Sequence, residues 1–214
     1  MSTPERETRP FREAYHRYMS FRILSLLTLA GALLSAADTK FDYRVLATNK
    51  TSTMETEINA AAAEGYVFAG VMGGRSAFRG NQMVAVMKKD LNNPATGRKY
   101  KVLATVKTST LEKELNEAGK NGFAYCGQTI YSTTFGGREV ALVLEYSPEN
   151  KGTRIEYKLA ATARTSTMQK ELSPAGDQGF LFQGVVIGRT ALGGSEVISI
   201  LQKPIREANL QASR

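Results

Sequence analysis

The chain of 214 residues has no tryptophan, one histidine and one cysteine. A lone cysteine cannot form a disulfide within the chain. Cys126 lies in the run FAYCGQTI, whose aromatic and apolar residues favour an inert, buried thiol over a nucleophile. With so little histidine and cysteine, zinc sites and Ser-His-Asp or Cys-His catalysis are excluded. We therefore predict a protein with no metal, no cofactor and no enzymatic activity.

Residues 1–37 are predicted to be a secretory signal peptide. An arginine-containing leader precedes the apolar run ILSLLTLAGALL, and the small residues Ser35 and Ala37 follow at the positions that a signal peptidase reads. The run is short for a transmembrane helix, although an uncleaved N-terminal anchor is the alternative. We expect a periplasmic or secreted protein that meets a membrane only through this segment, if the segment is uncleaved. His16 would leave with the leader, so the mature chain would contain no histidine.

The formal net charge is +8, and removal of the leader, with five arginines and three glutamates, leaves about +6. A basic chain tends to meet nucleic acid, anionic lipid or acidic polymers, but the sign alone determines solubility and encounter rate rather than function. The charges are mixed along the sequence and no nucleic-acid recognition motif is present, so no nucleic-acid partner is expected. Binding of an anionic polymer or nucleic acid is kept as the alternative function.

The sequence contains one motif in three copies. KTST at residues 50–53 recurs as KTST at 107–110 and as RTST at 164–167, a constant step of 57 residues. At this step, DYRVLATNKTSTMETEINAAAAEGYVFAGV aligns without a gap with KYKVLATVKTSTLEKELNEAGKNGFAYCGQ and with EYKLAATARTSTMQKELSPAGDQGFLFQGV. The predicted boundaries are residues 38–90, 98–147 and 154–205 for the three repeats, followed by a C-terminal tail at 206–214. Such self-similarity is typical of repeat architectures.

Each copy is predicted to form a strand, a helix and two further strands. YRVLAT alternates in polarity, which places Tyr43 on the same strand face as Val45 and predicts that Tyr43, Tyr100 and Tyr157 pack in the core. Apolar residues then recur at helical spacing. Three glycines are predicted to end the helices in the left-handed conformation: Gly65, Gly122 and Gly179. Pro174 should shorten or kink the third helix.

The TST tetrapeptide is interpreted as a helix start. Ser52-x-x-Glu55 has the pattern of a capping box, as do the equivalent residues of the other copies. The predicted N-caps are Ser52, Ser109 and Ser166, and loss of one should cost about 1 kcal/mol. The alternative is an anion site formed by the helix N-terminus and the preceding cation. The cations concerned are Lys50, Lys107 and Arg164.

These elements predict an α+β fold of three tandem β-α-β-β repeats. The last strand of each copy has apolar side chains on both faces, as in REVALVLEY, but a helix can cover only one face of a small sheet. We therefore expect antiparallel sheets that share a core, with the helices outside, in pseudo-threefold order.

The hairpins between the last two strands are the most divergent part of the repeat, and binding sites are commonly built on such loops. They contain the candidate binding residues Arg75, Arg79, Arg138 and Arg189. Either these side chains are solvated turn residues or they hold an anionic partner. The repeated acids are predicted to form ion pairs at the rim of the apolar stripe: Glu57, Glu114 and Glu171.

The second repeat resembles the small bacterial domains grouped as domain-of-unknown-function family 4177. The resemblance is carried by a Tyr-Lys-Val strand, a Leu-x-x-x-Leu-Asn helix and a Gly-x-x-Gly-aromatic turn: Tyr100, Lys101, Val102, Leu111, Leu115, Asn116, Gly119, Gly122 and Phe123. The other copies depart from it, because Ala62 replaces the first turn glycine and Ser173 replaces the asparagine. The family's turn tryptophan is Tyr66, Phe123 or Phe180 here. The order of elements is also similar to that of dodecin-like proteins.

The family has no assigned activity, so the resemblance implies a fold and not a function. We therefore expect an exported, non-catalytic binding or structural module of the cell envelope. Its partner is left open among an anionic small molecule, an envelope polymer and a protein.

Overall fold

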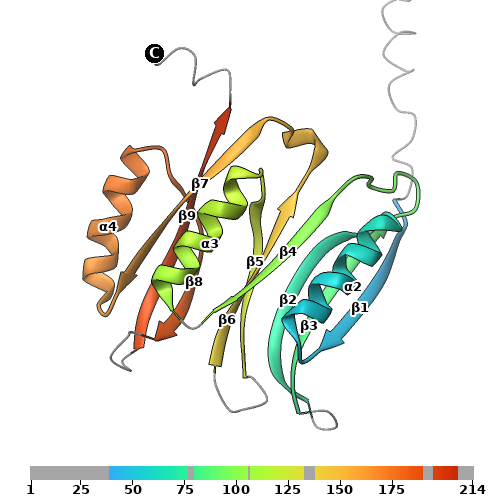
Figure 1. The fold of residues 1–214 in the computed structure, drawn as a ribbon, viewed down its shortest axis with the longest axis horizontal. Coiled ribbons are helices and arrows are strands. Elements are labelled where there is room, and N and C mark those ends of the chain that lie inside the picture. The colour runs from blue at the N-terminus through green and yellow to red at the C-terminus, as the bar shows by residue number, and fades with distance from the viewer. Residues whose placement is uncertain (1–38, 77–79, 106, 133–137, 190–194, 207–214) are drawn as a thin grey trace, which may run out of the picture. The chain divides into compact units, whose positions relative to one another are not determined.

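A computed structural model describes residues 39–76, 80–105, 107–132, 138–189 and 195–206 (Figure 1). The segment predicted as a signal peptide and the hairpin residue Arg79 lie outside this part of the chain. None of the helices in the described ranges is both long and apolar enough to cross a membrane.

Three β-α-β-β repeats follow one another along the chain (Figure 1). Repeat 1 consists of β1 (Phe41–Thr48), α2 (Thr51–Ala63), β2 (Val67–Ser76) and β3 (Gly80–Asp90). Repeat 2 consists of β4 (Lys99–Thr105), α3 (Thr108–Lys120), β5 (Ala124–Ser132) and β6 (Arg138–Tyr146). Repeat 3 consists of β7 (Thr153–Thr162), α4 (Thr165–Asp177), β8 (Leu181–Arg189) and β9 (Ser195–Arg206). A short 3-10 turn, Pro148–Asn150, lies between repeats 2 and 3.

Each repeat forms its own three-stranded antiparallel sheet, with the last strand in the middle: β1-β3-β2, β4-β6-β5 and β7-β9-β8. The register is the same in each copy, since Tyr43 pairs with Lys88 at the position where Tyr100 pairs with Glu145. All three sheets also have an irregularity at the same place in the second strand, between Phe68 and Gly70 in the first copy. The predicted fold class, with repeated units and helices packed against antiparallel sheets, is confirmed.

The helix ends differ in part from the sequence expectation. Each helix begins at the first threonine of TST, and Lys50, Lys107 or Arg164 occupies the N-cap position without a side-chain cap hydrogen bond. Ser52, Ser109 and Ser166 are therefore second residues of the helices and not N-caps, which corrects the prediction. The chain enters the first two helices through a turn in which a threonine hydroxyl accepts from the N-cap N–H, as between Thr48 and Lys50 (3.2 Å).

The helices end as the glycine pattern predicts. Gly65, Gly122 and Gly179 have φ of 91°, 79° and 84°, the left-handed conformation that glycine adopts without strain. Pro174 lies inside α4, yet α4 spans 13 residues like the other two helices, so the expected shortening does not occur.

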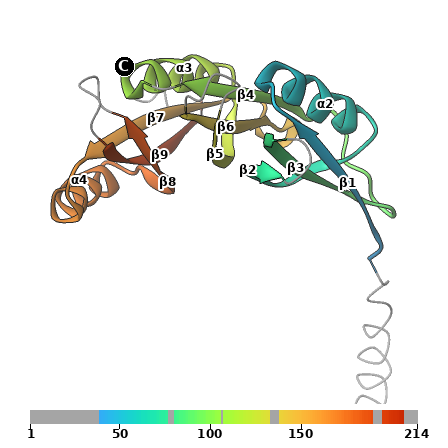
Figure 2. The ribbon, with the colours of Figure 1, turned by 90° about the horizontal axis from the view of Figure 1, so that it is seen from below.

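The buried side chains form clusters that join successive repeats. One cluster combines α2 and β3 of repeat 1 with Tyr100, Ala141 and Val143 of repeat 2. A second combines α3 and β6 of repeat 2 with residues of repeat 3, including Tyr157 and Ile200. The third cluster contains residues of repeat 3 alone. The sheets therefore share their core with a neighbour, as expected, but no cluster of the described residues holds both repeat 1 and repeat 3. The repeats follow one another in an open series (Figure 2), so the expected pseudo-threefold order is wrong.

The face of each sheet that points away from its own helix is here called its back face, and the face toward the helix its front. The back faces of sheets 2 and 3 are covered by the repeat that precedes each of them. Within the described residues, sheet 1 has no preceding repeat. Tyr43 on its back face is 61% exposed, whereas the equivalent Tyr100 and Tyr157 are each 3% exposed. The prediction that all three tyrosines pack in the core is wrong for Tyr43.

Candidate functional site: the joints between repeats and the two open ends

The contact between two successive repeats is here called a joint. In the joint between repeats 1 and 2, side chains of the first repeat form hydrogen bonds with backbone groups at the edge of the second sheet. Helix α2 lies against β4, the outer strand of that sheet. The amide of Asn59 on α2 donates to the carbonyl of Tyr100 (2.8 Å) and accepts from its N–H (2.9 Å). One turn earlier on this helix, the carboxylate of Glu55 accepts from the N–H of Val102 (2.8 Å). The helix thus gives partners to backbone groups that otherwise need another strand or water.

The joint between repeats 2 and 3 repeats this arrangement. Asn116 on α3 donates to the carbonyl of Tyr157 (3.0 Å) and accepts from its N–H (2.9 Å). The carboxylate of Glu112 accepts from the N–H of Leu159 (3.2 Å). The Ser-x-x-Glu pattern is therefore not a capping box. Glu55 and Glu112 instead accept hydrogen bonds from backbone N–H groups of the next repeat.

The third helix lacks this pair of side chains. Gln169 stands at the position of Glu55, and Ser173 stands at the position of Asn59. The Ser173 hydroxyl donates within its own helix, to the carbonyl of Gln169 (3.3 Å). The substitution coincides with the last repeat that the structure describes.

A second feature of each joint is an aromatic side chain over a glycine. A Cβ added to Gly127 would lie 2.8 Å from Cε1 of Phe68 in the preceding repeat, and one added to Gly184 would lie 2.8 Å from the hydroxyl of Tyr125. Real Cβ atoms do not approach other atoms so closely, so a larger residue at either position would have to displace the aromatic side chain that lies over it. At Gly70, the equivalent residue of repeat 1, no atom lies within 4 Å of such a Cβ.

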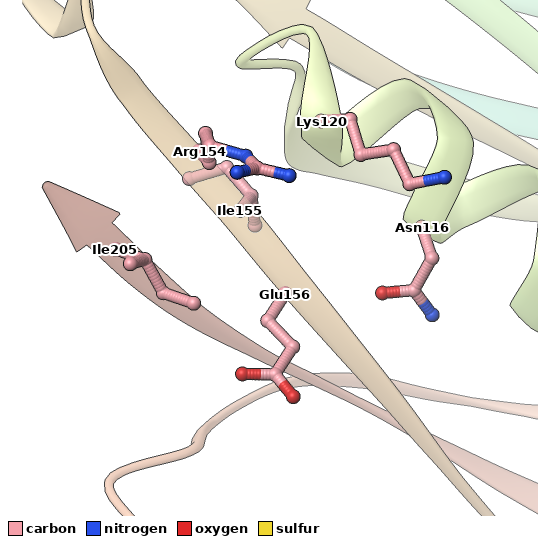
Figure 3. A pocket seen from close by; sticks show the side chains of 6 residues that line it. All are labelled: Asn116, Lys120, Arg154, Ile155, Glu156 and Ile205. Atoms are coloured by element: carbon pink, nitrogen blue, oxygen red, sulfur yellow. The ribbon is translucent and has the colours of Figure 1, made fainter. Parts of the chain in front are cut away.

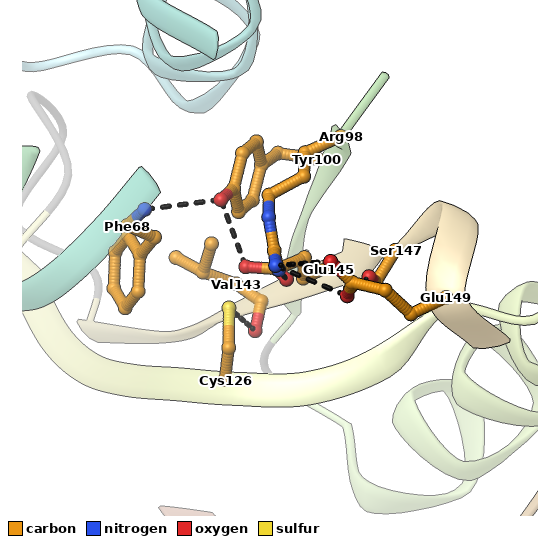
Figure 4. A network of polar contacts seen from close by, with 8 residues as sticks. All are labelled: Phe68, Arg98, Tyr100, Cys126, Val143, Glu145, Ser147 and Glu149. Atoms are coloured by element: carbon orange, nitrogen blue, oxygen red, sulfur yellow. Dashed lines mark hydrogen bonds and ion pairs between the residues drawn. The ribbon is translucent and has the colours of Figure 1, made fainter. Parts of the chain in front are cut away.

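A polar network closes the first joint (Figure 4). The Tyr100 hydroxyl accepts from the N–H of Phe68 (3.0 Å) and donates to Glu145 (2.8 Å). Arg98 forms ion pairs with Glu145 and with Glu149 (3.1 Å). Burial raises the pKa of Tyr100, and the hydrogen bond to Glu145 raises it further, so the phenol remains a neutral donor. These groups are paired with one another within repeat 2 and the turn that follows it, and the bond from the Phe68 N–H to Tyr100 ties them to repeat 1, which makes the network structural.

The lone cysteine belongs to the same joint. Cys126 packs against the first cluster, and its thiol lies 3.2 Å from the carbonyl of Val143 (Figure 4). Burial raises the pKa of the thiol well above its usual range, and the nearby Glu145 carboxylate acts in the same direction. Both effects keep the thiol protonated and poorly nucleophilic.

A pocket between α3, β7 and β9, here called the groove, lies at the second joint (Figure 3). It is lined by Asn116, Lys120, Arg154, Ile155, Glu156 and Ile205. Lys120 is already paired with Glu117 (2.9 Å), and Glu156 offsets one of the two cations. The groove could attract an anion only weakly. In the described residues, no group of three or more His, Cys, Asp or Glu could hold a metal ion.

The candidate residues from the sequence are dispersed. Lys50, Lys107 and Arg164 are exposed at the three helix starts, one in each repeat. Three of the hairpin arginines lie in the last or first residues of strands, but their side chains are outside the described part of the structure: Arg75, Arg138 and Arg189.

The repeated acids also act differently from the prediction. Glu57 and Glu114 are half-buried and Glu171 is exposed, and the ion pairs formed within the described ranges do not include them. Asn59 and Glu55 were not identified as joint residues from the sequence. The signal that could have found them is the change to Ser173 and Gln169 in the last copy alone.

Two apolar surfaces remain open at the ends of the array. The back face of sheet 1 exposes Phe41, Tyr43, Val45 and Met72. The strand register shows that they share one face. Tyr43 pairs with Lys88, Val45 with Val86 and Met72 with Val84, and these three residues of β3 lie on the same face as one another. At the other end, the front of β8 exposes Phe182, Val185 and Ile187.

No protein-family model matches the chain, and neither a curated protein nor a solved structure matches it.

Proposed function

We propose that this chain is an exported, non-catalytic binding or structural module of the cell envelope, and that it binds through the back face of sheet 1. The observation that carries the proposal is the exposure of four large apolar side chains at positions that are covered in repeat 3. Phe41, Tyr43 and Met72 are exposed, whereas their equivalents Ile155, Tyr157 and Val186 are buried.

Such a face is costly to leave in water. Soluble proteins rarely expose contiguous apolar patches beyond a few hundred Å², and larger ones mark interaction sites. Phe41 and Tyr43 add aromatic rings, which are enriched at interfaces. The ammonium of Lys88 lies 5.7 Å from the ring centroid of Phe41, so a cation lies beside the apolar surface. This composition suits a protein partner.

The placement of the repeated polar residues supports a role without catalysis. The asparagines and glutamates that recur at Asn59, Asn116, Glu55 and Glu112 hold the joints together. Tyr100 and Glu145 are paired within the first joint. The function of these groups is to fix one repeat on the next, which builds a scaffold that presents its ends.

Thiol labelling in living cells tests the proposal. Val45→Cys in a Cys126→Ala background places a single thiol on the back face of sheet 1. We expect a maleimide to label it readily in dilute purified protein and at least about tenfold more slowly in intact cells. Thr56→Cys, at an exposed position of α2, is the matched control and should react equally in both. Equal labelling of Val45→Cys in both settings would contradict a binding role for this face. Fractionation of the same cells tests export.

Binding of an anionic polymer is the alternative, favoured by the net charge of +8 and by the two cations of the groove. It predicts retention on immobilised heparin that falls steeply as salt is raised. Lys120→Gln together with Arg154→Gln should then elute earlier than Lys50→Gln together with Lys107→Gln. Retention that does not change with salt excludes this alternative.

A further inference from the structure

We infer that the partner of the back face of sheet 1 is repeat 3 of a second copy of this chain, docked head to tail. The inference rests on the proposed function and names its partner. The chain forms the same kind of joint twice, between repeats 1 and 2 and between repeats 2 and 3. Each joint has two surfaces, and one copy of each surface is left exposed at an end of the array.

One half is the back face of sheet 1. Residues equivalent to Phe41, Tyr43 and Met72 line the back face of sheet 3, where repeat 2 buries them. The outer edge of β1 is also open to a helix. Tyr43 N–H, whose equivalents bond Asn59 and Asn116, instead donates to the side chain of its neighbour Asp42 (2.9 Å).

The other half is the front of β8. Phe182 stands at the position of Phe68 and Tyr125, whose side chains pack into the joints with the next repeat. Val185 stands at the position of Val71, which lies 3.6 Å from a Cβ placed on Gly127. Phe182 is 51% exposed and Val185 is 43% exposed, because none of the described residues forms a repeat after repeat 3.

The two halves have matching shapes. In each internal joint an aromatic side chain lies over a glycine of the next repeat, Phe68 over Gly127 and Tyr125 beside Gly184. The remaining aromatic residue is Phe182, and the remaining glycine is Gly70, which has open space where a Cβ would be. A head-to-tail contact places Phe182 of one copy over Gly70 of the next.

The contact between two copies would have fewer hydrogen bonds than the joints within the chain. Gln169 can still accept from the N–H of Val45, as Glu55 accepts from Val102. Ser173 has a single oxygen on a shorter side chain in place of the separate amide nitrogen and oxygen by which Asn59 holds Tyr100, and its hydroxyl already donates to Gln169. The contact should therefore be reversible and dependent on concentration. Because it joins two different surfaces, it produces open chains of copies or closed rings rather than a twofold dimer.

Site-directed cross-linking tests the geometry. The full-length sequence is expressed in a Cys126→Ala background, and the protein is purified in the form that cells accumulate. Gly70→Cys and Phe182→Cys variants are treated with a short thiol cross-linker, separately and mixed. We expect covalent dimers in the mixture and at most traces in each variant alone. Phe68→Cys with Gly127→Cys in one chain is the matched control, and it should cross-link within the chain.

Sedimentation velocity over a range of protein concentrations measures the association itself. Val45→Lys should weaken it at least about tenfold, since a charge would be buried without a partner. Ser173→Asn together with Gln169→Glu restores the side chains of the internal joints and should strengthen it about tenfold. This gain cannot arise from misfolding. The association should also depend little on salt.

The outcomes separate the inference from the proposed function. A chain that stays monomeric at all concentrations, or cross-links of Phe182→Cys mainly to itself, would overturn the inference. If Val45→Cys is nevertheless shielded in cells, the proposed function stands with a different partner. If that thiol is also open in cells, both fail.

Discussion

Asn59 takes the place of a neighbouring strand for Tyr100. Its side-chain amide donates to the Tyr100 carbonyl and accepts from the Tyr100 N–H, as a peptide group of a paired strand does. The edge of sheet 2 is thereby closed by one side chain from another repeat. Asn116 does the same for Tyr157. This relationship determines how one unit is placed on the next, and it is the source of the first prediction.

Asn59→Ala and Asn116→Ala should each lower the free energy of unfolding by about 1–3 kcal/mol, because a buried strand edge loses both partners. Ser173→Ala is the matched control at the equivalent position, where no repeat follows, and should change it by less than about 0.5 kcal/mol. Urea denaturation monitored by circular dichroism measures these differences. A loss of the same size at all three positions would show that the residue stabilises its own helix and not the joint.

Much of this fold could be predicted because the signals are local and occur three times. The alternation of YRVLAT and the helical spacing of Met54 and Ile58 depend on single elements. The left-handed conformation of Gly65 follows from the end of a helix next to it. Repetition at a constant step strengthens each of these signals.

The joints could not be predicted for the opposite reason. The pattern Ser52-x-x-Glu55 fits a capping box as well as it fits a bond from Glu55 to Val102, and only the tertiary arrangement distinguishes them. Likewise, Tyr43 and Tyr100 occupy the same place in the repeat and differ in exposure because repeat 2 has a predecessor. The strand pattern is the same in both copies, so it does not show which back face a neighbouring repeat covers.

The second prediction compares two helical glycines, Gly119 in α3 and its equivalent Gly176 in α4, of which the second is the control. A Cβ on Gly119 would lie 2.0 Å from the carbonyl oxygen of Ile155 in the next repeat, whereas no atom lies within 4 Å of one on Gly176. Gly119→Ala should therefore destabilise the chain by at least about 2 kcal/mol, because backbone must move. Gly176→Ala should stabilise it by about 0.5–1 kcal/mol through helix propensity. Thermal and urea unfolding of both variants would measure the contrast, and a stabilising Gly119→Ala would rule out the close approach of α3 to β7.

The third prediction concerns stability at alkaline pH. Burial raises the pKa of Tyr125 to about 12 and also raises the pKa values of Tyr100 and Tyr157. A tyrosine in an unfolded chain ionises near pH 10, so above that pH the unfolded state releases protons that the folded state retains. Stability is thus fully present below pH 10 and falls above it, by about 1.4 kcal/mol per pH unit for each such group.

The Tyr125→Phe variant should lose stability less steeply above pH 10 than the unsubstituted chain does. Urea unfolding at half-unit steps from pH 8 to pH 11 measures both slopes. Identical slopes would mean that the Tyr125 phenol reaches solvent in the folded chain.

The last prediction uses Cys126 as a reporter of the first joint. Cys126 is partly buried against the cluster that joins repeats 1 and 2, and desolvation of the thiol holds its pKa above the usual range. An aromatic disulfide reagent at pH 8 should therefore modify it far more slowly than a free thiol. Gly127→Val displaces the ring of Phe68, which lies over this glycine, and should raise the rate at least about tenfold by populating an open joint. Gly70→Val, at the equivalent position with open space around it, should leave the rate unchanged. Equal rates in the Gly127→Val variant and the unsubstituted chain would mean that the first joint does not control access to the thiol.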